Sequence, residues 1–177
     1  MITYTTSKSN EELMQILELQ KRNLQENLED EEKVLQGFVT VKHSLEILQQ
    51  MNNTCPHTIA KQNNKVIGYA LSMTKNFASD IDVLKPMFLE ISKTIKEENY
   101  IVMGQICIDK EYRGIGVFRG LYKHMAEEVC KSNYDIIITE IDVKNERSLN
   151  AHKNIGFKNR KDYFFENKNW RIVSLKI

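Results

Sequence analysis

The stretch YIVMGQICIDKEYRGIGVFRGLYKHMAEEVC, residues 100–130, gives the strongest indication of the fold. Its first part, residues 100–108, is rich in branched apolar side chains and predicts a buried central strand. From Gly116 the apolar period becomes helical, and one face of the predicted helix carries Phe118, Leu121, Tyr122, Met125 and Val129. A strand, a glycine-containing turn and an amphipathic helix therefore follow one another.

The turn EYRGIG, residues 111–116, is suited to binding an anion. Glycine lets the backbone bend sharply and present successive N–H groups where the helix begins. Together with a helix dipole of about half a unit charge, these donors can hold a phosphate. The glycines of this region cluster closely in sequence: Gly104, Gly114, Gly116 and Gly120. A turn that uses glycine for geometry alone is the alternative.

Two common phosphate-binding motifs do not fit this turn. The dinucleotide fingerprint GxGxxG starts at Gly114 and Gly116 but has Arg119 where it requires its third glycine. A P-loop is excluded because no Gly-Lys-Ser/Thr sequence follows.

The rest of the chain alternates between predicted helices and strands. Before residue 100 we expect a strand at 2–6, helices at about 10–26, 44–51 and 82–95, and a hairpin that turns at Asn63-Asn64. After residue 130 we expect a strand at 134–143, a short helix at 146–155, and a closing hairpin that turns at 167–169. This order predicts an α/β (α+β) fold, with a mixed sheet layered by helices.

Length and composition indicate one soluble domain spanning residues 1–177. The chain is 41% hydrophobic and 28% charged, which is ordinary for a globular protein. A formal charge of +1 argues against a nucleic-acid partner. No apolar run reaches the ~20 residues of a membrane span, and no signal peptide is recognisable, so we expect no membrane association and a cytoplasmic location. The cysteines, Cys55, Cys107 and Cys130, show neither zinc-site nor disulfide spacing, and we expect no metal.

The segment from Arg113 to Phe118 resembles the cofactor motif Gln/Arg-x-x-Gly-x-Gly/Ala of the GNAT (Gcn5-related N-acetyltransferase) family, with Phe118 in place of the last small residue. VKNERSLNAHKNIGF, residues 143–157, resembles a second segment of that family, N-x-x-(Ala/Ser)-x-x-x-(Tyr/His)-x-x-x-Gly-Phe. The resemblance implies a mixed, mostly antiparallel central sheet flanked by helices on both faces and splayed near residues 105 and 142. It also implies an acyl-CoA-dependent N-acetyltransferase that moves an acetyl group from acetyl-CoA to a primary amine of a small molecule or peptide, by direct attack in a ternary complex.

The resemblance also implies which residues hold acetyl-CoA. Strand backbone would meet the pantetheine arm at Ile106, Cys107 and Ile108. The backbone amides around the pyrophosphate would be those of Arg113, Gly114, Ile115, Gly116, Val117, Phe118 and Arg119. Asn145 would lie near the pantetheine or the splayed strand ends, or would simply cap the helix that follows it. The adenosine 3′-phosphate would meet a basic cluster: Lys144, Arg147, Lys153, Lys158, Arg160 and Lys161.

Acyl transfer to an amine requires a proton acceptor, because a lysine-like amine has a pKa of about 10.4. Glu140 and Asp142 share one face of the predicted strand and are candidate bases. A water relay, or Gln105 positioning the amine, is the alternative. His152 stands where many family members carry a tyrosine, beside the cofactor, and could protonate the leaving thiolate; a histidine on a surface helix that makes only a local hydrogen bond is the alternative. Tyr163 is a second candidate for the acid.

Two other functions and the acceptor site stay open at this point. A non-catalytic acyl-CoA-binding or sensing domain would grip the cofactor without an amine site, and a scaffold domain would bind no nucleotide. The acidic segment 26–32 and the apolar segment 36–41 are candidate walls of an acceptor pocket. Family members often form dimers, so a homodimer is possible.

Overall fold

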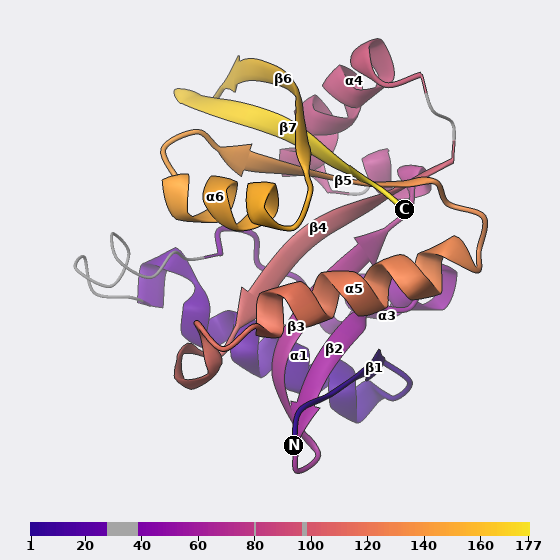
Figure 1. Cartoon of the computed structure of the whole chain (residues 1–177), viewed down its shortest axis with the longest axis vertical. Helices are drawn as coiled ribbons and strands as arrows, with labels where there is room; N and C mark the ends of the chain where they lie inside the picture. The colour runs from indigo at the N-terminus through magenta and orange to yellow at the C-terminus, as the bar shows by residue number, and fades with distance from the viewer. Residues whose placement is uncertain (28–38, 80, 97–98) are drawn as a thin grey trace.

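The computed structural model describes residues 1–27, 39–79, 81–96 and 99–177. One seven-stranded sheet runs through the molecule in the order β1-β2-β3-β4-β5-β7-β6 (Figure 1). Its strands are β1 (Thr3–Thr6), β2 (Thr58–Gln62), β3 (Lys65–Met73), β4 (Tyr100–Ile108), β5 (Ile136–Asp142), β6 (Lys158–Phe165) and β7 (Lys168–Lys176). Among these strands only β4 and β5 pair in parallel. The predicted mixed, mostly antiparallel sheet is confirmed.

Helices cover both faces of the sheet, as predicted. Apolar side chains of α1 (Asn10–Asn23), α3 (Leu45–Thr54) and α4 (Lys85–Thr94) form one core with one face of the strands, here called the α1 face. Those of α5 (Val117–Cys130) and the α6 region (α6, Glu146–Asn154) form the core of the opposite, α5 face. Four short 3₁₀ helices complete the described elements: η1 (Gln25–Asn27), η2 (Lys75–Ser79), η3 (Asp82–Leu84) and η4 (Lys110–Tyr112). Because alternate strand residues point to opposite faces, the sheet is buried between two cores.

Local sequence signals account for several element boundaries. The side chain of Ser9 caps α1 and that of Ser44 caps α3, each accepting a hydrogen bond from a backbone N–H three residues on. Asn63 and Asn64 have the positive φ angles of a two-residue hairpin turn, as predicted. The closing hairpin turns instead at Glu166 and Asn167, which also have positive φ. The predicted turn at 167–169 was therefore placed slightly too late in the chain.

β4 and β5 separate toward their carboxyl ends, which opens the sheet where splaying was expected. Their pairing extends from Tyr100↔Ile136 to Val102↔Ile138 and stops there, although both strands continue. The pairing of β4 with β3 skips Gly104, so β4 contains a bulge at this point. A bulge bends a strand and increases its local twist. The bulge therefore accounts for the departure of β4 from β5.

Two findings concern the described residues as a whole. Within the described ranges, no helix has the length and apolar character that crossing a bilayer requires. Across the same ranges, no group of three or more His, Cys, Asp or Glu side chains is placed to hold a metal ion.

Candidate functional site

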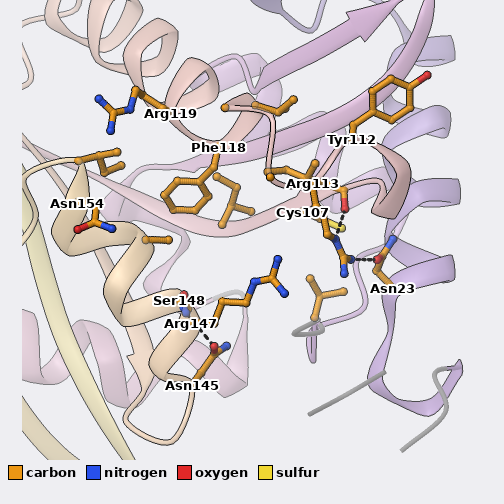
Figure 2. Close-up of a pocket in the computed structure, with 18 residues that line it drawn as sticks. Asn23, Cys107, Tyr112, Arg113, Phe118, Arg119, Asn145, Arg147, Ser148 and Asn154 are labelled. Carbon is orange, nitrogen blue, oxygen red and sulfur yellow. Dashed lines mark hydrogen bonds between the residues drawn. The ribbon is translucent and has the colours of Figure 1, made fainter. Parts of the chain in front are cut away.

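A cavity of about 490 Å³ lies between the carboxyl end of β4, the following turn, the start of α5, and α6 (Figure 2). Ten of the predicted cofactor-binding residues line it: Ile106, Cys107, Ile108, Arg113, Gly114, Gly116, Val117, Phe118, Arg119 and Asn145. Two other predicted residues are not among its lining. Ile115 is 63% exposed at the tip of the turn, and His152, on α6, is buried with its ring packed against Phe118 and Tyr122 of α5.

The turn before α5 has the backbone that an anion site requires. Gly114 and Gly116 have φ angles of +78° and +92°, which side chains rarely tolerate. A Cβ at either position would have no protein atom within 4 Å, so the space above the turn is open. No side chain caps the start of α5 at Gly116, and the first N–H groups of a helix have no acceptor within that helix. The residues that carry these amides, Val117 to Arg119, line the cavity, where the amides and the helix dipole would favour an anion.

Neighbouring elements hold the turn in place. The Arg113 guanidinium donates through Nε to the carbonyl of Ile108 at 3.0 Å and through a terminal nitrogen to Oδ1 of Asn23, on α1, at 2.6 Å (Figure 2). The hydroxyl of Tyr112 donates to Oε1 of Gln62 at 2.7 Å. A turn held from several sides loses little conformational freedom when it binds a ligand.

The other two clustered glycines have packing roles. Gly104 occupies the β4 bulge, and a Cβ there would lie 3.2 Å from the Met73 methyl carbon. A Cβ on Gly120 would lie 2.1 Å from the Tyr4 ring, which packs on α5. The clustering in sequence therefore has two causes, because only Gly114 and Gly116 line the cavity.

Cys107 lines the cavity but is not a reactive thiol. Its side chain belongs to the core of the α1 face, and burial raises the pKa of the thiol to about 12. Together with Ile106 and Ile108, it contributes a strand segment that pairs with β3 on one edge only, because β5 has already diverged. On its other edge, the backbone N–H and C=O groups of this segment face the gap between β4 and β5.

α6 contributes one wall of the cavity through Asn145, Arg147 and Ser148. Asn145 lines the cavity, and its side chain accepts from the Ser148 N–H at 3.0 Å as the cap of α6. The basic cluster is divided. Arg147 lines the cavity, whereas Lys161 turns to the opposite face and pairs with Glu90 of α4 at 2.5 Å.

His152 is enclosed, which does not favour the predicted role as the acid. Its Nδ1 lies 2.8 Å from the Ser148 carbonyl and its Nε2 lies 2.8 Å from the Tyr122 hydroxyl. A carbonyl only accepts, so Nδ1 carries the proton and Nε2 accepts from Tyr122. Burial lowers the pKa of His152 to about 4. A neutral imidazole with both nitrogens engaged has no proton available for a thiolate.

Phe118 separates His152 from the cavity. Its ring lines the cavity and packs edge-on against His152, with ring centroids 4.9 Å apart. Tyr122 and Phe157 complete the same aromatic cluster. Phe118, which replaces the small residue of the family motif, therefore directs its ring toward α6. The start of α5 remains part of the cavity lining.

Glu140 and Tyr163 form a pair on the α1 face. Glu140 lies on the diverging part of β5, beyond the last pair with β4, and its carboxylate accepts a hydrogen bond from the Tyr163 hydroxyl. Burial raises the pKa of Glu140 to about 7, and the Tyr163 hydrogen bond opposes that rise. A carboxylate near half ionisation at neutral pH is suited to exchange a proton.

Asp142, the other candidate base, has a local structural role. Its Oδ1 accepts from the Lys144 N–H at 2.9 Å, and its carbonyl accepts from the Asn145 N–H at 2.8 Å. Asp142 therefore shapes the turn from β5 into α6.

The sequence interpretation missed Asn23, which also lines the cavity, and it placed Val39 only in the candidate acceptor segment 36–41 although this residue lines the same cavity. Asn23 is 6% exposed and Gln20 only 1% exposed, so two polar side chains occupy the buried face of α1. Both residues follow Ile16 at helical spacing and so lie on the apolar face of α1, where a polar residue is unusual. This position was the signal in the sequence that could have identified them. The predicted acceptor segments 26–32 and 36–41 lie only partly within the described residues, at 26–27 and 39–41.

Comparisons with known proteins agree with this architecture. The profile of the acetyltransferase (GNAT) family matches residues 13–157. The fold is similar to a ribosomal-protein-S18-alanine N-acetyltransferase from Escherichia coli, with TM-score 0.68 and 14% identity over 100% of this chain and 94% of that one. It is also similar to an N-acetyltransferase from Staphylococcus aureus Mu50, with TM-score 0.65 and 17% identity over 99% of this chain and 98% of that one.

A third similar structure contains a cofactor. It is a putative acetyltransferase from Salmonella typhimurium with its cofactor acetyl-CoA, at TM-score 0.67 and 13% identity over 99% of this chain and 94% of that one. The sequence gives no significant match among curated proteins.

Proposed function

Because the chain belongs to the acetyltransferase (GNAT) family, we propose that it transfers an acetyl group from acetyl-CoA to a primary amine by direct attack in a ternary complex. The observation that carries this proposal is the open glycine turn at the start of α5, beside the gap between β4 and β5. The two features offer, next to each other, a phosphate site and a strand edge for an amide-containing arm.

The residues around the cavity fit acetyl-CoA by their chemistry. The amides of Val117 to Arg119 suit the pyrophosphate, and the cavity contains cationic side chains from Arg119 and Arg147. Residues 106–108 of β4 suit the pantetheine amides, because a peptide-like arm can add to an unpaired strand edge. When bound, acetyl-CoA would supply the acetyl group as a thioester whose thiol, with a pKa of about 8.5, leaves readily.

Glu140 is the group that we assign as the base. A protonated amine of pKa about 10.4 must lose a proton before it attacks. Glu140 can accept that proton directly or through one water, since its pKa of about 7 leaves it about half ionised at neutral pH. The Tyr163 hydroxyl donates to the carboxylate and orients it. Tyr163 is thus a partner of the base, and its hydroxyl proton is engaged.

Backbone donors are assigned the remaining electrostatic role. Beyond Val102 the described strand pairings leave one edge of β4 without β5. N–H groups on that edge can stabilise negative charge that develops on a carbonyl oxygen in the gap. His152 is assigned to support of the α5–α6 contact, because its nitrogens bind Tyr122 and Ser148.

The test combines binding with turnover. Calorimetry should detect CoA, and free thiol should appear when acetyl-CoA is mixed with an accepted amine from a panel of four. The panel consists of spermidine, an aminoglycoside, a peptide with a free N-terminus, and an N-blocked peptide containing lysine. CoA binding without thiol release on any amine would instead identify a cofactor-binding domain. No heat with CoA would refute the proposal.

A further inference from the structure

The segment 39–44 stands between two cavities. Val39 lines the cofactor-side cavity together with Asn23. Thr40 to Ser44 line a second cavity of about 580 Å³, whose described lining also includes Ile47, Ile81 and Asp82. This segment precedes α3 and belongs to the α1 face, the face that also carries Glu140 and Tyr163. A wall shared by two cavities can influence how two ligands meet.

The first attachment of the wall comes from the cofactor turn. Arg113 donates to the side chain of Asn23 at 2.6 Å. The carbonyl of the same asparagine accepts from the Val39 N–H at 3.0 Å, and its side-chain amide donates to the Leu19 carbonyl at 2.8 Å. Asn23 therefore joins the turn, the end of α1 and the start of the wall.

The second attachment comes from β4, just after the bulge. Gln105 donates through Nε2 to the Val41 carbonyl at 2.8 Å. Its Oε1 accepts from Gln20 at 2.8 Å and from the Tyr69 hydroxyl at 2.6 Å. Both lone pairs of this oxygen are thus occupied. The side chain is committed to the wall, which argues against its holding an acceptor amine directly.

Gln20 closes the network on His43, at the far end of the wall. The Gln20 Oε1 accepts from the His43 backbone N–H at 2.8 Å, which sets the orientation of the side-chain amide. Its Nε2 then lies 2.8 Å from His43 Nδ1. An amide nitrogen only donates, so Nδ1 must be unprotonated and the ring proton must sit on Nε2.

We propose that segment 39–44 is the wall along which acetyl-CoA and the acceptor amine meet, and that Gln20, Asn23 and Gln105 are positioning residues that hold it against the cofactor turn and β4. The proposal rests on the acetyl-transfer function proposed above, and it assigns the second cavity to the acceptor. The role of these three residues is to fix the position of the wall. Each is 7% exposed or less, and each forms a hydrogen bond with the backbone of the wall or with another residue of the network.

The test compares Gln20→Met with Gln15→Met. Both glutamines lie on α1 and hold backbone, but Gln15 accepts from the Val66 N–H at 2.7 Å, away from the wall. Hydrogen exchange of residues 39–44 should become at least about tenfold faster in Gln20→Met than in Gln15→Met, measured with and without CoA. The Kd for CoA should stay within about threefold of the wild type. For an accepted amine of the panel, KM should rise by about tenfold or more.

Equal exchange of the wall in the two variants would overturn the proposal. Should Gln20→Met fail to fold, the wild type still provides a test, because nitrogen NMR shifts report the tautomer of His43. A proton on Nδ1 would contradict the network, and a proton on Nε2 would support it. The exchange and NMR measurements on the free protein need no ligand. CoA that gives no heat would therefore count against the proposed function alone.

Discussion

Replacing Glu140 with glutamine is expected to remove most of the activity while stabilising the fold at alkaline pH. A general base contributes typically about 10²–10⁴-fold to the rate, so kcat/KM of Glu140→Gln should fall by about that factor at pH 8. CoA affinity should not change, because the carboxylate lies outside the lining of the cofactor-side cavity.

The Tyr163 hydroxyl provides a graded version of the same experiment. Its hydrogen bond lowers the pKa of the Glu140 carboxyl, so Tyr163→Phe should raise that pKa above about 7. A hydrogen bond to a charged group is worth about 1.5–3 kcal/mol, which corresponds to about 1–2 pKa units. The acid limb of the pH–rate profile should move up by that amount. Activity at pH 7 should then fall roughly 5–50-fold and recover above about pH 9.

Stability should move in the opposite direction to activity in Glu140→Gln. The pKa of this carboxyl is raised from 4.5 to about 7 on folding, so the folded state holds the proton more tightly. The contribution of Glu140 to the free energy of unfolding is then largest below about pH 4.5 and declines as pH rises through 7, by at most ~3 kcal/mol. A glutamine carries no charge and avoids that loss. The variant should therefore unfold at higher urea than the wild type at pH 8, and the gain should vanish at about pH 4.

The assay pairs thiol release across about pH 5.5–9.5 with urea unfolding at the two pH values. A wild-type profile without an ionisation between about pH 6 and 8 would refute the assignment of the base. So would a glutamine variant that keeps more than about a third of the activity at pH 8.

Three further predictions address the turn, the packing of α5 and the buried histidines. Gly116→Ala should cost ~1–2 kcal/mol of stability because of its left-handed φ, and should weaken CoA binding more than tenfold in calorimetry. Gly156→Ala is the control: its φ is +107° and it lies outside the cavity lining, so it should cost a similar ~1–2 kcal/mol of stability and leave CoA affinity unchanged. Gly120→Ala should lower the free energy of unfolding, measured in urea, by ~1–3 kcal/mol because its Cβ would meet the Tyr4 ring. Adding Tyr4→Ala should recover part of that loss, and no change in Gly120→Ala would mean that the ring is not packed there. Burial lowers the pKa of three histidines from 6.5 to about 4, so the unfolded state binds the extra protons and their contribution to stability should fall as pH drops from about 6.5 to 4. The measurement uses Glu140→Gln, which removes the opposing titration of Glu140; a flat urea midpoint in this variant over this window would contradict the burial of the histidines. These histidines are His43, His57 and His152.

The elements that sequence analysis predicted well are those whose signals are local. Residues 100–108 form β4, and the helix expected after Gly116 is α5. Asn63 and Asn64 turn a hairpin because asparagine tolerates positive φ at low cost. The glycine turn could be located for the same reason, since its backbone demands act within a few residues. A positive φ or a helical period is a property of neighbouring residues.

Contacts between distant segments required the folded structure. Arg113 meets Asn23 across 90 positions, and Gln20 meets Gln105 across 85. Nothing near either pair in the sequence specifies its partner, because the meeting depends on how α1 packs against β3 and β4. The orientation of His152 is a similar case. The motif position was recognisable, but the burial of its ring followed from the aromatic cluster around Phe118.

The amino-acid sequence by itself determined the order of strands and helices, the position of the anion-binding turn and the family that the chain resembles. Tertiary structure alone decided where β4 and β5 part, which carboxylate is partly desolvated beside Tyr163, and which polar groups hold segment 39–44. The physical reason is range. Backbone preferences act over one or two turns of chain, whereas desolvation and side-chain hydrogen bonding depend on every segment that packs around a group.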